Sequence, residues 1–220
     1  MAKTKLRRFA ENDCFPHLIQ QHKGYPIPEH ELKGNWNKSF FKRNAPLVLE
    51  LACGRGEYTV NLAQKFPEKN FIGIDWKGAR LWRGAKTVDE EKMTNVGFLR
   101  IQILNILSYF GKDEVDELWI TFPDPHLQES REQKRLTSQR FLDLYRSFVK
   151  PGGIINLKTD SKELYDFTLE VIAEKKLEIL KYTDDLYTSE LLDEILSIKT
   201  TYEKIWLKEG LNICYLQYRI

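Results

Sequence analysis

Several features that would define other classes of protein are scarce or missing in this chain. No apolar run approaches the 18 or more residues that cross a membrane. The first residues, MAKTKLRRFAEND, are basic and lack the apolar core of a secretory signal. Only three cysteines occur, without short spacing, which argues against a disulfide framework and favours the reducing cytoplasm. No Gly-Lys-Ser/Thr motif is present, which excludes a P-loop.

A metal site is not expected either. Cys14, His17, His22 and His30 are close in sequence, but their spacing fits no zinc pattern. The fourth histidine, His126, can stack on a base, contact a phosphate, or be a neutral residue in solvent.

Positive charge is concentrated at the start of the chain. The formal net charge is only +2, yet residues 1–43 hold nine Lys and Arg against four acids. Such a segment can supply sequence-independent phosphate contacts, or it can be a solvated leader without a partner. Prolines and glycines interrupt it repeatedly, and no clean periodicity appears. We therefore predict a basic N-terminal arm at 1–46, which can be flexible, followed by one domain at 47–220.

From Leu47 onward, strands and helices alternate at the spacing of βαβ units. The expected strands are 47–52, 70–75, 96–101, 116–122, 153–158, 176–183 and 212–219. The expected helices are 56–66, 78–92, 104–110, 136–149, 161–175 and 197–209. Several strands are apolar on both faces, and the last two are more polar. This pattern predicts an α/β fold with seven strands in a mostly parallel sheet, helices on both faces and an antiparallel edge pair.

The most informative stretch is LVLELACGRG, residues 47–56, followed by FIGIDWKG. The first strand reaches Glu50 before a turn with Gly54 and Gly56, and the second strand ends at Asp75. Glycines let the backbone approach a ligand, and an acid at this place can accept hydrogen bonds from ribose hydroxyls. The form E-x-A-C-G-x-G resembles the first motif of Rossmann-like methyltransferases that bind S-adenosylmethionine. An ordinary strand-to-helix turn is the alternative.

Further candidates follow later strands. In ITFPDP, two prolines hold Asp124 at a strand end, where its carboxylate can face the ligand crevice or form a structural turn. Lys134 and Arg135 can meet phosphate or start a solvated helix. Asp160 is a second carboxylate at the crevice edge or a helix N-cap. Thr200 and Glu203 share a helix face, which by pattern alone is an ordinary amphipathic helix.

The motifs in their order resemble the tRNA (guanine-N7-)-methyltransferases of the bacterial TrmB type. The resemblance covers nearly the whole chain and rests most on FPDP with a following RLT, then TD, then T-x-Y-E before G-x-x-I. It implies a Rossmann-like class I methyltransferase that uses S-adenosylmethionine on tRNA, at a guanine in the variable loop, as a monomer or homodimer. The implied cofactor-binding residues are Glu50, Gly54, Gly56, Asp75, Gln102 and Asp124. Asp124 is also the implied catalytic residue, and the implied guanosine-binding residues are Asp160, Thr200 and Glu203.

The sequence departs from the family pattern in three places. Gln102 stands where the family has Asp or Asn beside the adenine, and Asn105 is a nearby alternative. Gln128 replaces a substrate-contacting Lys, and Ile205 replaces a frequent Lys or Arg. Two other functions are weighed: a methyltransferase acting on a protein or small molecule, and an RNA-binding module with a decayed site. The ordered motifs disfavour the first, and the presence of Glu50, Asp75 and Asp124 disfavours the second.

Overall fold

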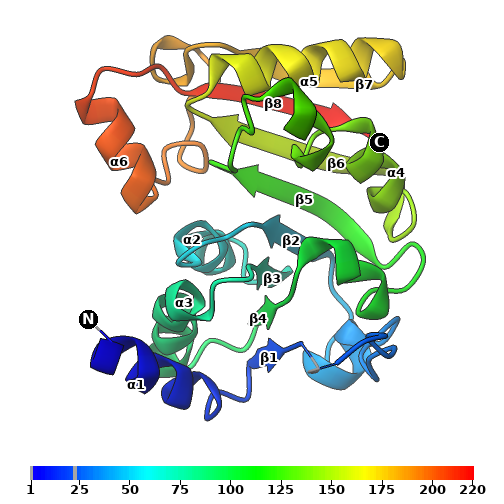
Figure 1. Cartoon of the computed structure of the whole chain (residues 1–220), viewed down its shortest axis with the longest axis vertical. Coiled ribbons are helices and arrows are strands. Elements are labelled where there is room, and N and C mark those ends of the chain that lie inside the picture. The colour runs from blue at the N-terminus through cyan, green and yellow to red at the C-terminus, as the bar shows by residue number, and fades with distance from the viewer. Residues whose placement is uncertain (1, 22–23) are drawn as a thin grey trace.

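The computed structural model describes residues 2–21 and 24–220. In this part of the chain eight strands form one sheet, in the order β1-β4-β3-β2-β5-β6-β8-β7 (Figure 1). The strands are β1 (Leu18–Gln20), β2 (Leu47–Leu51), β3 (Asn70–Ile74), β4 (Val96–Arg100), β5 (Val115–Thr121), β6 (Val149–Thr159), β7 (Glu178–Thr183) and β8 (Cys214–Arg219). Neighbours from β1 to β6 pair in parallel, whereas β8 is antiparallel to both β6 and β7. The predicted fold class is confirmed, with one strand more than the seven expected.

Helices cover both faces of the sheet because its central strands are apolar on both sides. The helices are α1 (Ala2–Asn12), α2 (Glu57–Lys65), α3 (Gly78–Glu91), α4 (Gln139–Tyr145), α5 (Lys162–Glu174) and α6 (Thr201–Lys208). Along β2, Leu47, Leu49 and Leu51 pack in one cluster with α4 and α5. Val48 points the other way and packs with α2 and α3. The two-residue alternation therefore divides the core into one layer on each face.

The extra strand comes from the segment ahead of Leu47. Residues of β1 pair with β4, and Figure 1 shows α1 beside α3 at the end of the molecule away from β7. Asn12 Nδ2 donates to the carbonyl of Gly78 at 2.8 Å, and the buried Trp36 donates to the carbonyl of Tyr109 at 2.8 Å. The sequence analysis found no clean periodicity in this segment, which is wrong for the 11-residue helix α1. Strand β1 was not predicted because a three-residue strand has too little pattern. The separate arm and its flexibility stay predictions, but this segment contributes to the core.

Strand β6 begins earlier than the sequence suggests. The sequence predicts a helix at 136–149 and a strand at 153–158, which leaves Pro151 and Gly152 between the two. Instead, α4 ends at Tyr145 and Val149 already pairs with Val115. The register shifts before the next pair, and Gly152 adopts a φ of 78° there. The proline and glycine thus form an irregularity within a strand, which both residues tolerate.

No helix within residues 2–21 and 24–220 is long and apolar enough to cross a membrane. The same ranges contain no group of three or more His, Cys, Asp or Glu residues that could hold a metal ion. His22 lies outside the described residues.

Candidate functional site

A cavity of about 400 Å³ lies at the carboxyl ends of the parallel strands. Ala52 follows β2, Asp75 follows β3, Gln102 comes after β4, and Asp124 comes after β5, and all four line it. Apolar side chains, together with Lys77 and Arg80, complete the walls. The volume falls in the range of about 300–1,000 Å³ that is usual for small-molecule sites. Three residues predicted from separate motifs, Asp75, Gln102 and Asp124, are therefore brought together in one cavity.

The glycine turn beside this cavity uses its two glycines differently. Gly54 has a φ of 58°, and a Cβ added there would meet nothing within 4 Å. Gly56 has a φ of 68°, and its Cβ would lie 2.4 Å from the Phe98 ring. Asp75 accepts a hydrogen bond from the Gly54 amide at 2.9 Å, which ties the turn to the end of β3. Gly54 thus leaves space at the turn, while Gly56 allows close packing with β4.

Glu50 lies behind the turn, not in the cavity. It is 3% exposed and accepts hydrogen bonds from the Thr59 amide at 2.8 Å and the Thr121 hydroxyl at 2.5 Å. The Thr59 hydroxyl donates to it as well. Glu50 therefore joins the start of α2 to the end of β5. Direct contact with a cofactor stays a prediction, and the observed contacts give Glu50 a supporting role.

The burial of Glu50 predicts a pH effect on stability. Burial is the main cause that raises the pKa of Glu50 from 4.5 to about 7. The folded protein therefore binds this proton more tightly than the unfolded chain. Its stabilising contribution is complete below the unfolded pKa and is lost as pH rises through about 7. Relative to a Glu50→Gln variant, the wild type should lose roughly 2 kcal/mol between pH 5 and pH 8 in urea unfolding. Parallel stability profiles for the two proteins would contradict this assignment.

The FPDP loop, residues 122–125, exposes the Asp124 side chain to solvent, and the buried Arg135 binds the backbone of the loop. The Asp124 side chain is 73% exposed and accepts a hydrogen bond from the His126 amide at 3.1 Å. Arg135 is 9% exposed and donates to the carbonyls of Pro125 at 3.2 Å and His126 at 3.3 Å. Its guanidinium also lies 4.3 Å from the centroid of the Phe167 ring. This corrects the interpretation of Arg135 as a phosphate contact: its donors position the loop that carries Asp124.

A small crevice adjoins the main cavity and contains Thr200. The two spaces share Ala52, Arg80 and Phe122 in their walls. Thr200 therefore lies close to the glycine turn, and its role in substrate binding stays a prediction. Ala52 and Phe122 have φ values of 57° and 50°, a conformation that L-residues adopt at a cost of about 1–3 kcal/mol. Such strain is typical of functional sites.

Asp160 follows β6 and is half-buried. Burial raises the pKa of its carboxyl group. The helix cap that the sequence offered as its alternative role belongs to Ser161, whose hydroxyl accepts from the Leu164 amide at 3.2 Å. Asp160 is thus free of the capping role, and its substrate contact stays a prediction.

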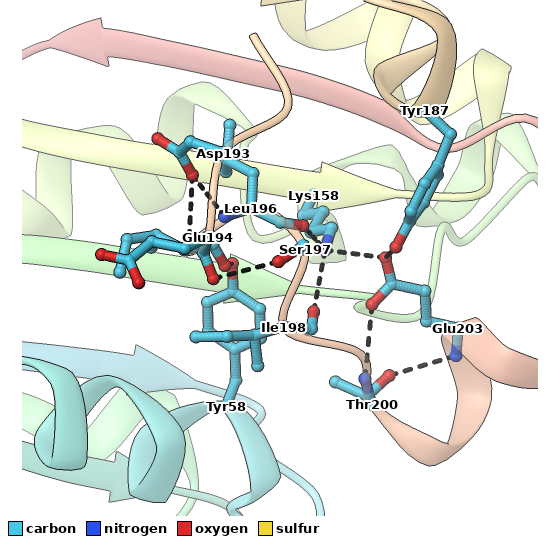
Figure 2. A network of polar contacts seen from close by, with 11 residues as sticks. Tyr58, Lys158, Tyr187, Asp193, Glu194, Leu196, Ser197, Ile198, Thr200 and Glu203 are labelled. Atoms are coloured by element: carbon cyan, nitrogen blue, oxygen red, sulfur yellow. Dashed lines mark hydrogen bonds and ion pairs between the residues drawn. The ribbon is translucent and has the colours of Figure 1, made fainter.

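Glu203 is the predicted site residue whose position differs most from expectation. It is 0% exposed and forms a 2.7 Å ion pair with Lys158, which is also 0% exposed (Figure 2). The Tyr187 hydroxyl donates to the same carboxylate at 2.7 Å, and the Thr200 amide donates at 3.3 Å. The Thr200 hydroxyl in return accepts from the Glu203 amide at 3.1 Å, which completes a capping box. The observed partners of Glu203 are Lys158, Tyr187 and Thr200, and contact with guanosine stays a prediction.

Lys158 is the residue that sequence reasoning missed. Its ammonium donates to the carbonyls of Leu196 at 2.6 Å and Ile198 at 3.0 Å, in addition to the pair with Glu203. Those three acceptors match its three N–H groups. The contacts also explain why α6 starts at Thr201 and not at 197, since two carbonyls of the preceding segment bind Lys158. The sequence feature that could have indicated its burial is the position of this lysine near the end of the apolar strand β6.

The structure also places the residues at which the sequence departs from the family pattern. Gln102 lines the cavity, whereas Asn105 Nδ2 donates to the side chain of Gln21 at 3.0 Å. Gln128 directly precedes a 3₁₀ turn at Glu129–Lys134, and Ile205 is 42% exposed on α6. Of the two residues offered for the adenine, Gln102 has the better position.

Comparisons with known proteins agree with this geometry. A family profile described as "Putative methyltransferase" matches residues 44–216. A tRNA (guanine-N(7)-)-methyltransferase from Christiangramia forsetii is 48% identical over 100% of this chain and 99% of the relative. One from Bacteroides thetaiotaomicron is 46% identical over 100% of this chain and 87% of the relative. The solved 16S rRNA methyltransferase KamB shares the fold, with a TM-score of 0.66, 14% identity, and coverage of 91% of this chain and 98% of that one.

The sheet order and the cavity beside its glycine turn define a Rossmann-like class I methyltransferase that uses S-adenosylmethionine. Within that class, the family is decided by the two relatives that are 46% and 48% identical over the full length of this chain. The chain belongs to the tRNA (guanine-N7-)-methyltransferase family.

Proposed function

We propose that this protein transfers a methyl group from S-adenosylmethionine to N7 of a guanine in tRNA, in the variable loop. The observation that carries the proposal is the convergence of Asp75, Gln102 and Asp124 on one cavity in a chain that is 48% identical to a full-length relative of that name. A cytoplasmic location is proposed with it, because tRNA is the substrate.

The residues of the cavity suit S-adenosylmethionine. The ligand combines a ribose with an adenine, which calls for acceptors of hydroxyl hydrogens and for an apolar wall. Asp75 is the carboxylate proposed for the ribose, and Gln102 is the amide proposed for the adenine amine. Ile101 and Phe122 supply apolar surface in the same cavity. Gly54 leaves room at the turn, since no atom lies within 4 Å of the position its Cβ would take.

The proposed methyl transfer makes little demand for general-base catalysis by the protein. When bound, S-adenosylmethionine supplies an electrophilic methyl group on a sulfonium. Guanine N7 is a lone-pair nucleophile with no proton to lose, so no strong general base is required. Methylation leaves positive charge on the purine ring. Asp124 is proposed to accept hydrogen bonds from the guanine N1–H and exocyclic amine, and a carboxylate placed there stabilises that charge as it develops.

Two further residues are proposed to bind the guanosine. Asp160 is half-buried at the end of β6, and Thr200 lines the crevice next to the cavity. Glu203 is proposed to act with them through its capping box with Thr200, which holds the start of α6 in place. Loop bases that are not stacked in a helix are the usual targets of sequence-specific RNA recognition, which supports the variable loop as the target.

The test is methyl transfer with labelled S-adenosylmethionine and bulk tRNA. We expect label in tRNA, and none when the tRNA has already been fully methylated at guanine N7. The pre-methylated tRNA is the matched control, because it has the same shape and charge pattern elsewhere. Equal labelling of both tRNA samples would place the methyl group at another atom. Tight cofactor binding with no transfer to either sample would contradict the proposed substrate.

A further inference from the structure

A groove between α1 and the start of α3 is not used by the chemistry described above. Its volume is about 320 Å³. Apart from Gly78 and Ala79, its lining residues are cationic or aromatic, and in the described part of the chain no carboxylate lines it. We call it the α1–α3 groove, and its lining side chains are Lys5, Phe9, Trp76, Lys77, Arg80 and Arg100.

The cations of the α1–α3 groove have no acidic partners. Among residues 2–21 and 24–220, none of the ion pairs involves Lys5, Lys77, Arg80 or Arg100. Lys5 and Lys77 are also exposed. Positive side chains that the protein does not neutralise are the feature that phosphate groups of a nucleic acid require.

The groove also offers an aromatic surface. Trp76 is 49% exposed, although a tryptophan is usually buried for most of its area. The guanidinium of Arg100 lies 4.8 Å from the Phe9 ring centroid and 5.7 Å from that of Trp76. Arg100 is held by hydrogen bonds to the side chain of Gln20 at 2.8 Å and the carbonyl of Trp76 at 3.3 Å. An exposed indole beside cations without acidic partners is a combination on which unpaired RNA bases stack.

The groove continues into the proposed active site. Trp76, Lys77 and Arg80 line both the α1–α3 groove and the cofactor cavity. Arg80 also reaches toward α6, with its guanidinium 5.5 Å from the Tyr202 ring centroid. Asp124, which is proposed to face the target guanine, lines the same cofactor cavity. A nucleotide next to the target guanine can therefore extend along the wall of Trp76, Lys77 and Arg80 into the groove.

We propose that the α1–α3 groove binds an unpaired nucleotide of the RNA next to the target guanine. The base stacks on Trp76, and Lys5 and Lys77 contact the adjacent phosphates. The inference rests on the proposed function for the identity of the RNA, and it assigns to α1 a place in substrate binding.

The first test compares tRNA affinity for single variants. Trp76→Ala should weaken tRNA binding about tenfold, because stacking of one base accounts for that much affinity. Tyr182→Ala is the matched control, since Tyr182 is 65% exposed on β7 at the opposite edge of the sheet. The dissociation constant for S-adenosylmethionine is measured in parallel by calorimetry. An equal loss of cofactor and tRNA affinity would overturn the proposal and assign Trp76 to the cofactor.

The second test uses salt. Lys5→Ala should reduce the slope of log affinity against log salt by about 0.7–0.9, which corresponds to one phosphate contact. Lys181→Ala, an exposed lysine on β7, should leave the slope unchanged. An unchanged slope for Lys5→Ala together with wild-type affinity for Trp76→Ala would overturn the proposal. Both readouts are binding measurements, so they remain decisive even if the methyl-transfer assay contradicts the proposed reaction.

Discussion

Replacing Asp124 with asparagine is expected to lower kcat for methyl transfer by about a hundredfold. Asparagine keeps the size of the side chain but removes the negative charge that is proposed to face the methylated purine. The loop itself should hold its shape, since Arg135 binds its carbonyls and not the Asp124 carboxylate. The dissociation constant for S-adenosylmethionine should change much less than kcat. Single-turnover kinetics and calorimetry separate the two quantities.

The matched control is Asp166→Asn, which removes an aspartate from the exposed surface of α5. Its kcat should equal that of the wild type. If Asp124→Asn also kept wild-type turnover, the proposed catalytic role would be wrong. A loss of cofactor affinity as large as the loss of kcat would instead make Asp124 a cofactor-binding residue.

Replacing Lys158 with methionine is expected to destabilise the fold by about 3–5 kcal/mol. Methionine fills a similar volume but leaves the Glu203 carboxylate buried without its cation, and it frees the carbonyls of Leu196 and Ile198. Burial lowers the pKa of Lys158, although the nearby Glu203 opposes this shift. Urea unfolding followed by tryptophan fluorescence measures the loss. The double variant Lys158→Met with Glu203→Gln should recover part of it, because the unpaired charge is gone.

The exposed ion pair between Lys162 and Asp166 supplies the control for that experiment. Both of these side chains are at least half exposed. Lys162→Met should therefore cost less than about 1 kcal/mol. A similarly small loss for Lys158→Met would show that the buried pair does not hold the segment before α6 in place.

Much of the fold could be predicted because its local patterns agree with its tertiary structure. The buried strands at Leu47–Leu51 and Asn70–Ile74 are apolar runs bounded by polar residues and turns, and both were located to within a residue. Strand β1 could not be found in this way, because its three residues become a strand only by pairing with β4. The start of β6 was missed for a related reason: pairing with Val115 outweighs the local effect of Pro151 and Gly152.

The lining of the cavity was predictable where a motif places a residue at a strand end. Asp75, Gln102 and Asp124 follow strands whose carboxyl ends meet, so the topology brings them together. The burial of Glu203 was not predictable, because it depends on Lys158, which lies 45 residues earlier in the chain. The contact of Arg135 with the FPDP loop also depends on how the chain folds back between them, so it could not be predicted from the motif. Sequence motifs thus predicted which residues lie at this edge of the sheet, but not their burial or their partners, and their roles in binding stay predictions.

The most direct test of the central claim is to map the methylated base. After reaction with S-adenosylmethionine, the tRNA is treated with borohydride and aniline, which cleave the chain at N7-methylguanosine. We predict a single new cleavage, in the variable loop, that depends on the wild-type enzyme and forms about a hundredfold more slowly with Asp124→Asn. Methyl incorporation into tRNA without any cleavage would contradict it, because the methyl group would then be on another atom.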